Sequence, residues 1–198
     1  KGQFVEVGGR VIKKVIEPLN LIQNSFRVNV DRAGLIRSEI LRDLHSLITR
    51  EVKLGHFSRQ EEASMVPVCI LEQLIENDKQ GKMRTSKMKI LDMCCCPGSK
   101  TKQMLTVLRQ KFEGVSCLVA NDSDPVRIRT MQNQLEKMPF ENVILTCERG
   151  EDLSDKIGTE FFDYVYADVP CSGDGTFRKA PALWAKWHLS NAFALHRI

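Results

Sequence analysis

A carboxylate, a proline and a thiol occur together in the segment Asp168-Val169-Pro170-Cys171-Ser172-Gly173. The segment directly follows the apolar run 164–167, which has the composition of a buried strand. Open α/β sheets bind their ligands at the carboxyl ends of such strands. Pro170 ends the strand and fixes the direction of Cys171, whose thiolate could attack a carbon atom. The segment therefore predicts a catalytic thiol beside a carboxylate, and an ordinary exit from strand to loop is the structural alternative.

A second chemical site spans residues 89–101, with the sequence Lys-Ile-Leu-Asp-Met-Cys-Cys-Cys-Pro-Gly-Ser-Lys-Thr. An apolar strand ends at Asp92, and a Pro-Gly turn leads into a stretch with helical spacing. The backbone N–H groups of such a loop, together with the helix dipole, attract carboxylates and phosphates. The glycine spacing fits neither the G-x-G-x-x-G fingerprint nor the P-loop, which argues against a dinucleotide pyrophosphate or a nucleoside triphosphate.

A third carboxylate, Asp122, follows a second apolar run at residues 116–120. An acidic residue about 20 positions after a glycine loop commonly binds ribose hydroxyls, and Asp122 lies at about that spacing from Gly98. Helix capping is the alternative role, and it suits Asp124 better. Asp124 precedes Pro125, so we expect Asp124 at the N-cap and Pro125 at the first helical position.

Taken together, these motifs resemble the RsmB/Nop–Sun family of S-adenosylmethionine-dependent RNA cytosine-5 methyltransferases. The family's loop Asp-x-Cys-Ala-Ala-Pro-Gly-Gly/Ser-Lys-Thr is similar to residues 92–101, with Cys95 and Cys96 in place of the two alanines. Its Asp-Ala/Val-Pro-Cys-Ser-Gly motif is similar to residues 168–173. Residues 58–67 resemble the segment upstream of the loop, and residues 173–179 look most like the eukaryotic tRNA-modifying branch.

The resemblance implies a role for each matched residue. S-adenosyl-L-methionine is expected to contact Asp92, Cys94, Cys95, Cys96, Pro97, Gly98, Ser99, Lys100, Asp122, Glu148 and Asp168. Within this set, Asp122 is expected at the ribose, and Glu148 stands where the family has an aspartate beside the adenine. The catalytic residues implied by the resemblance are Cys171, Asp168 and Lys100.

The resemblance also implies covalent catalysis. A thiolate that adds to C6 of cytosine makes C5 nucleophilic, C5 then takes a methyl group, and loss of the C5 proton expels the thiolate. In the RNA enzymes the Pro-Cys thiol is assigned to product release, and a Thr-Cys motif after the next strand supplies the attacking thiol. The sequence reaches Ile198 without that motif, so we expect a truncated domain without the attacking cysteine. Three alternatives stay open: a cofactor- or RNA-binding module without turnover, a DNA-type cytosine-5 methyltransferase in which Cys171 attacks, and a methyltransferase that acts on protein or a small molecule.

Apolar runs near 88–92, 116–121, 142–147 and 163–168 alternate with helical stretches, which predicts a parallel sheet. The resemblance makes this the Rossmann-like sheet of a class I methyltransferase, with helices on both faces and its C-terminal strands missing. We expect an accessory extension at 1–55 and the methyltransferase domain at 56–198. Within them, the pattern predicts a poorly anchored hairpin at 4–12, one amphipathic helix at 35–52, and a helix that begins at the capping box of Ser58 and Glu61.

Charge and composition complete the prediction. The formal net charge is +4, which permits binding to nucleic acid. Arg178, Lys179 and Lys186 lie beside Trp184 and Trp187, a combination that suits phosphates and unstacked bases, although core packing is the alternative for both tryptophans. The partner is therefore expected to be RNA, and the resemblance implies tRNA.

The sequence has no apolar run of the roughly 18 residues that a membrane span needs. Its 7 cysteines show neither disulfide-scaffold nor C-x₂-C zinc spacing, so we expect no metal and a reducing compartment, in the nucleus (nucleolus) or the cytoplasm.

Overall fold

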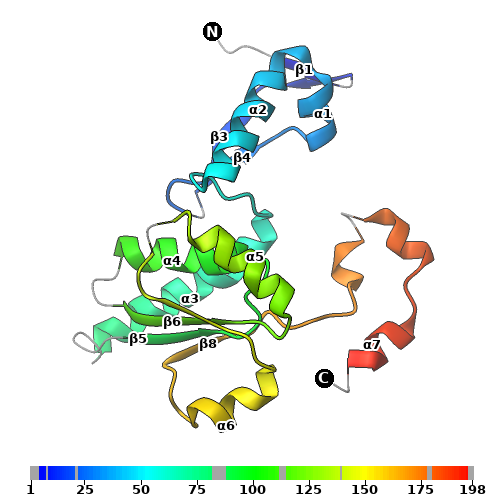
Figure 1. The fold of residues 1–198 in the computed structure, drawn as a ribbon. Helices are drawn as coiled ribbons and strands as arrows, with labels where there is room; N and C mark the ends of the chain where they lie inside the picture. The colour runs from blue at the N-terminus through cyan, green and yellow to red at the C-terminus, as the bar shows by residue number, and fades with distance from the viewer. Residues whose placement is uncertain are drawn as a thin grey trace.

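The computed structural model describes residues 5–7, 9–20, 22–81, 88–111, 115–138, 140–177 and 180–195. Its centre is a four-stranded sheet in the order β7-β6-β5-β8, and every pairing in it is parallel (Figure 1). The strands are β5 (Met88–Asp92), β6 (Val115–Asn121), β7 (Val143–Thr146) and β8 (Tyr164–Tyr166). The parallel sheet predicted from the four apolar runs is thus confirmed.

The strand order has one reversal. The chain passes outward from β5 to β6 and β7, and then returns to add β8 on the other side of β5. The ends of β5 and β8 therefore form the topological switch point, where open α/β sheets bind ligands. Both predicted chemical segments follow these two strands directly.

Helices cover both faces of the sheet (Figure 1). One face packs against α3 (Glu62–Gly81), α4 (Ser99–Lys111) and α5 (Pro125–Leu135). The other face packs against α6 (Leu153–Ile157), which follows the short helix η1 (Gly150–Asp152). Successive strand side chains point to opposite faces, so Leu118 lies in the first core while Val119 contacts Leu153 in the other. This is the class I methyltransferase arrangement that the sequence predicted.

The N-terminal elements form a smaller core of their own. They are β1 (Val5–Val7), β2 (Arg10–Ile12), β3 (Ile16–Pro18), β4 (Phe26–Val28), α1 (Arg32–Arg37) and α2 (Glu39–Leu54). The predicted hairpin forms, since β1 pairs with β2 in antiparallel fashion. The expectation that it is poorly anchored is wrong, because Val5 is buried in a cluster with Val30, Leu35 and Leu41. Phe4 lies outside the described residues.

The single helix predicted at 35–52 is wrong in one respect: the structure divides it at Ser38. Asp31 caps α1, and Ser38 then adopts an extended conformation (φ −81°, ψ 121°) before α2 begins. The turn lets α1 and α2 pack against each other, so Leu35 and Leu41 reach the same core. The division of domains at residue 55 stays a prediction; it falls at Gly55, whose left-handed conformation ends α2.

The start predicted for α3 is also wrong. The helix begins at Glu62, and Ser58 and Glu61 do not form a capping box. The residue Gln60 makes one local and one tertiary contact instead: its Nε2 donates to Ser64 O (2.9 Å) in α3 and to Gln103 Oε1 (2.9 Å) on α4. These contacts outweigh the local capping preference.

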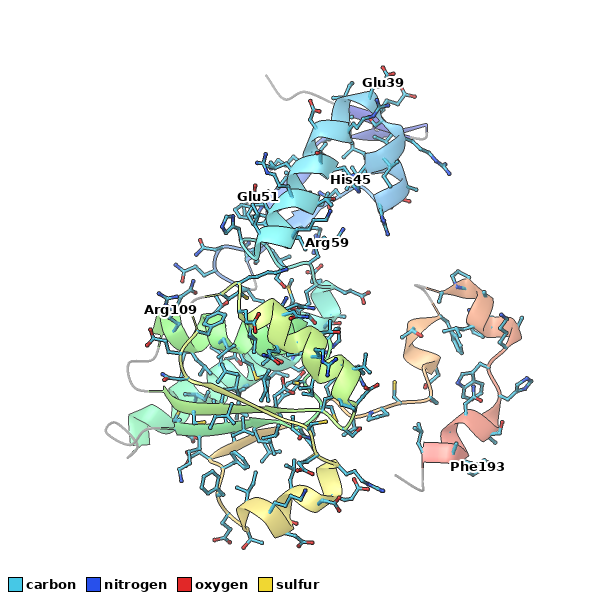
Figure 2. The ribbon with its side chains drawn as sticks, in the orientation of Figure 1. Glu39, His45, Glu51, Arg59, Arg109 and Phe193 are labelled. Atoms are coloured by element: carbon cyan, nitrogen blue, oxygen red, sulfur yellow. The ribbon has the colours of Figure 1, made fainter. Side chains whose placement is uncertain are left out.

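After β8 the chain forms η2 (Asp174–Thr176), η3 (Pro181–Ala185) and α7 (Leu189–Leu195). Phe193 of α7 is 62% exposed and projects from this segment (Figure 2). Strand β8 has β5 as its only neighbour in the described sheet, and Val165 on β8 is exposed. Within the described sheet, the outer edge of β8 is therefore unpaired. Among the described residues, no helix combines the length and the apolar character that a membrane crossing requires.

Candidate functional site

Asn121 ties three strand ends together beneath the candidate site. It is buried at the end of β6. Its Nδ2 donates to Met93 O (3.1 Å) and Glu148 O (2.9 Å), while its Oδ1 accepts from Thr146 Oγ1 (2.9 Å) and Glu148 N (3.0 Å). All four hydrogen-bonding positions of the amide are therefore used. The loops after β5 and β7 are thereby held in fixed relation to β6.

Asp92 ends β5 and lies buried under the predicted cofactor loop. Its Oδ2 accepts from Thr101 Oγ1 at 2.7 Å, whereas its Oδ1 is buried without a hydrogen-bond partner among the described residues. Burial raises the pKa of Asp92 to about 6, because the hydration that the carboxylate loses outweighs the hydrogen bond from Thr101 and the nearby charge of Lys100. A buried acceptor without a donor favours a cationic or hydrogen-bonding group above it.

The cysteines of the loop lie against a second carboxylate. Asp122 is buried, and its Oδ2 accepts from Cys96 N at 3.3 Å. Arg127 of α5 lies 3.4 Å from the same oxygen and also donates to Cys96 O at 2.5 Å. Asp122, predicted at the ribose, therefore also shapes the loop in this structure, and Arg127 lies beside the same carboxylate oxygen.

The three loop thiols are shielded to different degrees. Cys95 and Cys96 are buried with their sulfurs 3.7 Å apart, and Cys94 is half-buried. Burial raises the pKa of Cys96 to about 11 and raises that of Cys95 further, because the thiolate form would lose its hydration. The pair therefore stays in the thiol form and packs as two small apolar groups. Such packing fits the two positions at which the family's loop has alanines and this sequence has Cys95 and Cys96.

Gly98 allows the loop to approach α5. Its φ is +96°, and a Cβ on this residue would lie 2.1 Å from Met131 Sδ. Only glycine satisfies both the backbone conformation and this contact. Pro97 and Ser99 flank it, and the first turn of α4 starts at Ser99. The loop consequently lies directly on the helix start, which is the arrangement of anion- and nucleotide-binding turns.

Lys100 and Asp168 join the two predicted chemical segments. Lys100 Nζ donates to Asp168 Oδ2 at 2.5 Å. The lysine side chain is 21% exposed and the aspartate side chain 51% exposed, so the pair lies at the surface opening of the site. Asp168 lies two residues beyond the observed end of β8, within the loop and not on the strand. The ion pair places the Pro-Cys segment over the loop that follows β5.

Cys171 is exposed. The next residue, Ser172, accepts a hydrogen bond from Trp187, which lies later in the chain. Trp187 Nε1 donates to Ser172 O at 3.1 Å. Phe177 stacks on Trp184, with ring centroids 4.4 Å apart, and meets Trp187 edge-on at 6.2 Å. Trp184 is 71% exposed, so the core-packing alternative is wrong for this residue.

Glu148 and Lys186 are the remaining predicted site residues that the structure describes. Glu148 follows β7 and forms an ion pair with Lys156 of α6. Lys186 lies at the end of η3 and is exposed. Arg178 and Lys179 lie outside the described residues. No group of three or more His, Cys, Asp or Glu side chains within the described parts could hold a metal ion.

Sequence reasoning missed three residues that build the site: Asn121, Arg127 and Met131. Asn121 offered one signal, since a polar side chain directly after an apolar strand has to be hydrogen-bonded when buried. The roles of Arg127 and Met131 depend on how α5 packs against the loop, and no local pattern encodes that packing.

Comparison with known proteins agrees with this geometry. The family model described as 16S rRNA methyltransferase RsmB/F matches residues 82–193. The chain therefore belongs to the RsmB/F methyltransferase family, whose members use S-adenosylmethionine.

Individual relatives extend the comparison. A tRNA (cytosine(34)-C(5))-methyltransferase of Drosophila melanogaster is 33% identical over 186 residues, covering 88% of this chain and 24% of that protein. A multisite-specific tRNA:(cytosine-C(5))-methyltransferase of Saccharomyces cerevisiae is 29% identical, covering 98% of this chain and 28% of that protein. The chain thus spans about a quarter of the length of the curated relatives it matches.

Solved structures show the same fold. The crystal structure of NSun6 from Pyrococcus horikoshii with SFG, an S-adenosylmethionine analogue, has a TM-score of 0.57 and 26% identity, covering 75% of this chain and 33% of that one. The crystal structure of PH0851 has a TM-score of 0.62 at 20% identity, covering 87% of this chain and 33% of that one.

Proposed function

We propose that this chain is part of an enzyme that transfers the methyl group of S-adenosylmethionine to C5 of cytosine in RNA, with tRNA as the substrate. The observation that carries the proposal is the Lys100–Asp168 ion pair, which joins the loop after β5 to the Pro-Cys segment after β8. Family membership and the curated tRNA relatives support the same reaction.

The acids at the ends of the strands fit this cofactor. Asp92, Asp122 and Asp168 follow three strands of one parallel sheet, and so they lie along one edge. Asp92 Oδ1 is buried without a partner among the described residues, which suits the ammonium of the cofactor's methionine part. When bound, S-adenosylmethionine supplies an electrophilic methyl group on a sulfonium. The residues of the loop at 94–100 would hold its methionine portion, and Asp122 the ribose.

The Lys100–Asp168 pair positions the target base in this proposal. Lys100 occupies one carboxylate oxygen of Asp168, and the half-exposed carboxylate retains acceptor capacity for the N4 amino group of a cytosine. Reaching that point requires a base that has left its stack, as in other enzymes that modify bases. The pair also holds the Asp168 side chain beside Lys100.

Covalent catalysis follows from the chemistry of cytosine. A thiolate forms a bond to C6, the ring electrons shift to C5, and C5 then accepts the methyl group. Removal of the C5 proton restores the ring as the S–C6 bond breaks and the thiolate leaves. In our proposal the attacking thiol belongs to the Thr-Cys motif of the intact protein, and the exposed Cys171 assists its release.

The segment after Cys171 is proposed to contact the RNA. Exposed Trp184 offers one ring face for an unstacked base, and exposed Lys186 lies two residues beyond it. Replacing Arg178, Lys179 and Lys186 by Gln should weaken RNA binding and reduce its salt dependence, with cofactor affinity unchanged. A salt dependence equal to that of the wild type would place the RNA surface elsewhere.

Calorimetry tests the cofactor assignment. S-adenosylmethionine or its demethylated product should bind the wild-type chain, and Asp122→Ala should weaken binding by about 1–3 kcal/mol because a buried hydrogen-bonding partner is lost. A folded wild-type protein that binds neither compound would contradict the proposal.

We further propose that the protein acts inside the cell, in the nucleus or the cytoplasm. All 7 of its cysteines are free, which fits a reducing compartment. Microscopy of a fluorescently tagged intact protein tests this, and secretion into the medium would contradict it.

A further inference from the structure

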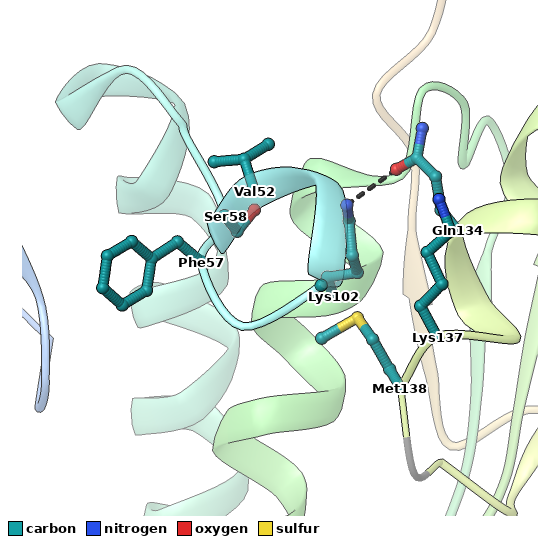
Figure 3. A pocket seen from close by; sticks show the side chains of 8 residues that line it. Val52, Phe57, Ser58, Lys102, Gln134, Lys137 and Met138 are labelled. Atoms are coloured by element: carbon teal, nitrogen blue, oxygen red, sulfur yellow. Dashed lines mark hydrogen bonds between the residues drawn. The ribbon is translucent and has the colours of Figure 1, made fainter. Parts of the chain in front are cut away.

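A cavity of about 220 Å³ lies where the end of α2 meets the start of α4 and the end of α5 (Figure 3). Its lining includes Gly55, Phe57, Ser58, Lys102, Gln134 and Lys137. None of the residues assigned above to the cofactor or to catalysis lines it. Its walls come from both the N-terminal extension and the methyltransferase domain, and no role for it follows from the proposed reaction.

The cavity carries positive charge that no acidic side chain in its lining balances. Lys102 Nζ is half-buried and donates to Gln134 Oε1 at 2.7 Å, which leaves further ammonium protons for another acceptor (Figure 3). Lys137 also lines the cavity, and no lining residue is acidic. Burial and the nearby Lys137 charge both lower the pKa of Lys102, because each disfavours the ammonium form. A negatively charged ligand in the cavity would stabilise the ammonium form of Lys102.

The acidic residues nearest in sequence are engaged elsewhere. Glu51 of α2 pairs with His56 and Arg50, and Glu136 accepts from Gln132 Nε2 at 3.1 Å. The walls are also closely fitted: a Cβ on Gly55 would lie 3.1 Å from Lys137 Cβ. Neither Glu51 nor Glu136 lines the cavity.

We propose that this cavity binds a phosphate group, and that its occupant is a backbone phosphate of the RNA substrate. The identity of the occupant rests on the function proposed above. Lysine binds phosphate as a point charge, and the hydroxyl of Ser58 adds a neutral donor. Ser58 and Lys137 are exposed, so the cavity is open to a group carried on a polymer.

The position of the cavity relative to the cofactor loop supports an RNA occupant. A Cβ on Gly98 would lie 3.9 Å from Gln134 Oε1, the atom that also binds Lys102. Lys102 belongs to the first turn of α4, as does Lys100 at the proposed target base. A strand of RNA gripped here would lie close to the reactive centre and would extend onto the N-terminal extension.

The test measures binding of unmodified tRNA transcripts to the intact protein over a series of salt concentrations. Lys102→Gln and Lys137→Gln should each weaken binding about 3–10-fold near 0.1 M salt and lower the slope of log K against log salt by about 1. The double variant should lower the slope by about 1 as well, because both lysines hold the same phosphate. Lys102→Arg should restore most of the affinity.

Lys53→Gln is the matched control, since it removes the same charge from an exposed position beside the cavity. Its slope should equal that of the wild type, and an equal loss in this control would overturn the proposal in favour of diffuse attraction. A thermal-shift titration with inorganic phosphate forms the second arm. If the lysine variants retain the wild-type salt slope while phosphate stabilises only the wild type, the RNA occupant is overturned and a free phosphate takes its place.

If neither arm distinguishes the lysine variants from the wild type, the site itself is refuted. Such a result leaves the proposed function standing as long as the wild type still binds tRNA and cofactor. Loss of those activities in the wild type would instead refute the function.

Discussion

Replacing Asp92 by Asn should make the folding stability of this chain less sensitive to pH. In the folded protein the pKa of Asp92 is raised from 3.8 to about 6, and burial is the largest cause. Below about pH 4 the carboxyl is protonated in both the folded and unfolded states. As pH rises through about 6, the folded state must ionise a buried group, and stability is lost. The amide that replaces the carboxyl in the variant carries no such charge.

The size of the effect follows from the shift. Each pKa unit corresponds to about 1.4 kcal/mol, so the shift from 3.8 to about 6 costs the wild type about 3 kcal/mol once Asp92 is fully ionised. The free energy of unfolding of Asp92→Asn minus that of the wild type should therefore rise by about 2 kcal/mol between about pH 4.5 and pH 7.5. The difference isolates this group from every other titrating residue.

Urea unfolding of both proteins across this pH range measures the difference directly. An amide that fits poorly would add a constant offset without changing the slope. Asp155→Asn, at an exposed position on α6, is the control. Its free energy of unfolding should stay within about 0.5 kcal/mol of the wild-type value at every pH. A difference that is flat, or that falls with rising pH, would refute the argument that burial raises the pKa of Asp92. The same variant should bind S-adenosylmethionine about tenfold more weakly, because the neutral amide cannot attract the ammonium.

Three further predictions concern the loops of the site. Gly98→Ala should destabilise the fold by about 2–4 kcal/mol in chemical denaturation, because its φ is positive and its Cβ would collide with Met131; Gly175→Ala, with open space around it, should change stability little, and equal effects would contradict this. Maleimide should label exposed Cys171 well before buried Cys96, whose pKa is about 11, and mass spectrometry showing the reverse order would mean that the loop opens readily. In the intact protein, Cys171→Ala should accumulate a denaturation-resistant adduct with RNA if Cys171 assists release, whereas loss of every adduct would identify it as the attacking thiol.

The sequence predicts the sheet well because its signals are local. Residues 88–92 form an apolar run that ends in Asp92, and the observed strand β5 has the same bounds. Asp124 caps α5 and Pro125 occupies the first turn, since this pair satisfies the free N–H groups and the backbone geometry of a helix start. Both predictions rest on interactions within a few residues of the chain.

Predictions fail where tertiary contacts outweigh local preference. Ser58 and Glu61 have the spacing of a capping box, yet Gln60 binds Gln103 on α4 and the helix begins at Glu62. Within the helix predicted at 35–52, the turn at Ser38 brings Leu35 of α1 and Leu41 of α2 into one core, and this packing between two helices is a tertiary contact that the local pattern does not show.

The candidate site shows the same division between local and tertiary information. The residues with chemical roles lie in contiguous motifs, so the sequence names them, and the strand order then brings Lys100 and Asp168 together. Asn121, with its four hydrogen bonds, and Arg127, over Asp122, depend on neighbouring loops. The lysine-lined cavity is likewise formed by segments that are distant in sequence.

The central claim is methyl transfer to C5 of cytosine in RNA, and nucleoside mass spectrometry tests it most directly. The intact protein is incubated with unmodified tRNA transcripts and S-adenosylmethionine carrying a deuterated methyl group, and the RNA is then digested. We predict labelled 5-methylcytidine with the wild type and a severe loss with Asp168→Asn, which removes the charge that pairs with Lys100. Label on another nucleoside, on the protein alone, or nowhere in the RNA while cofactor and tRNA both bind, would contradict the account.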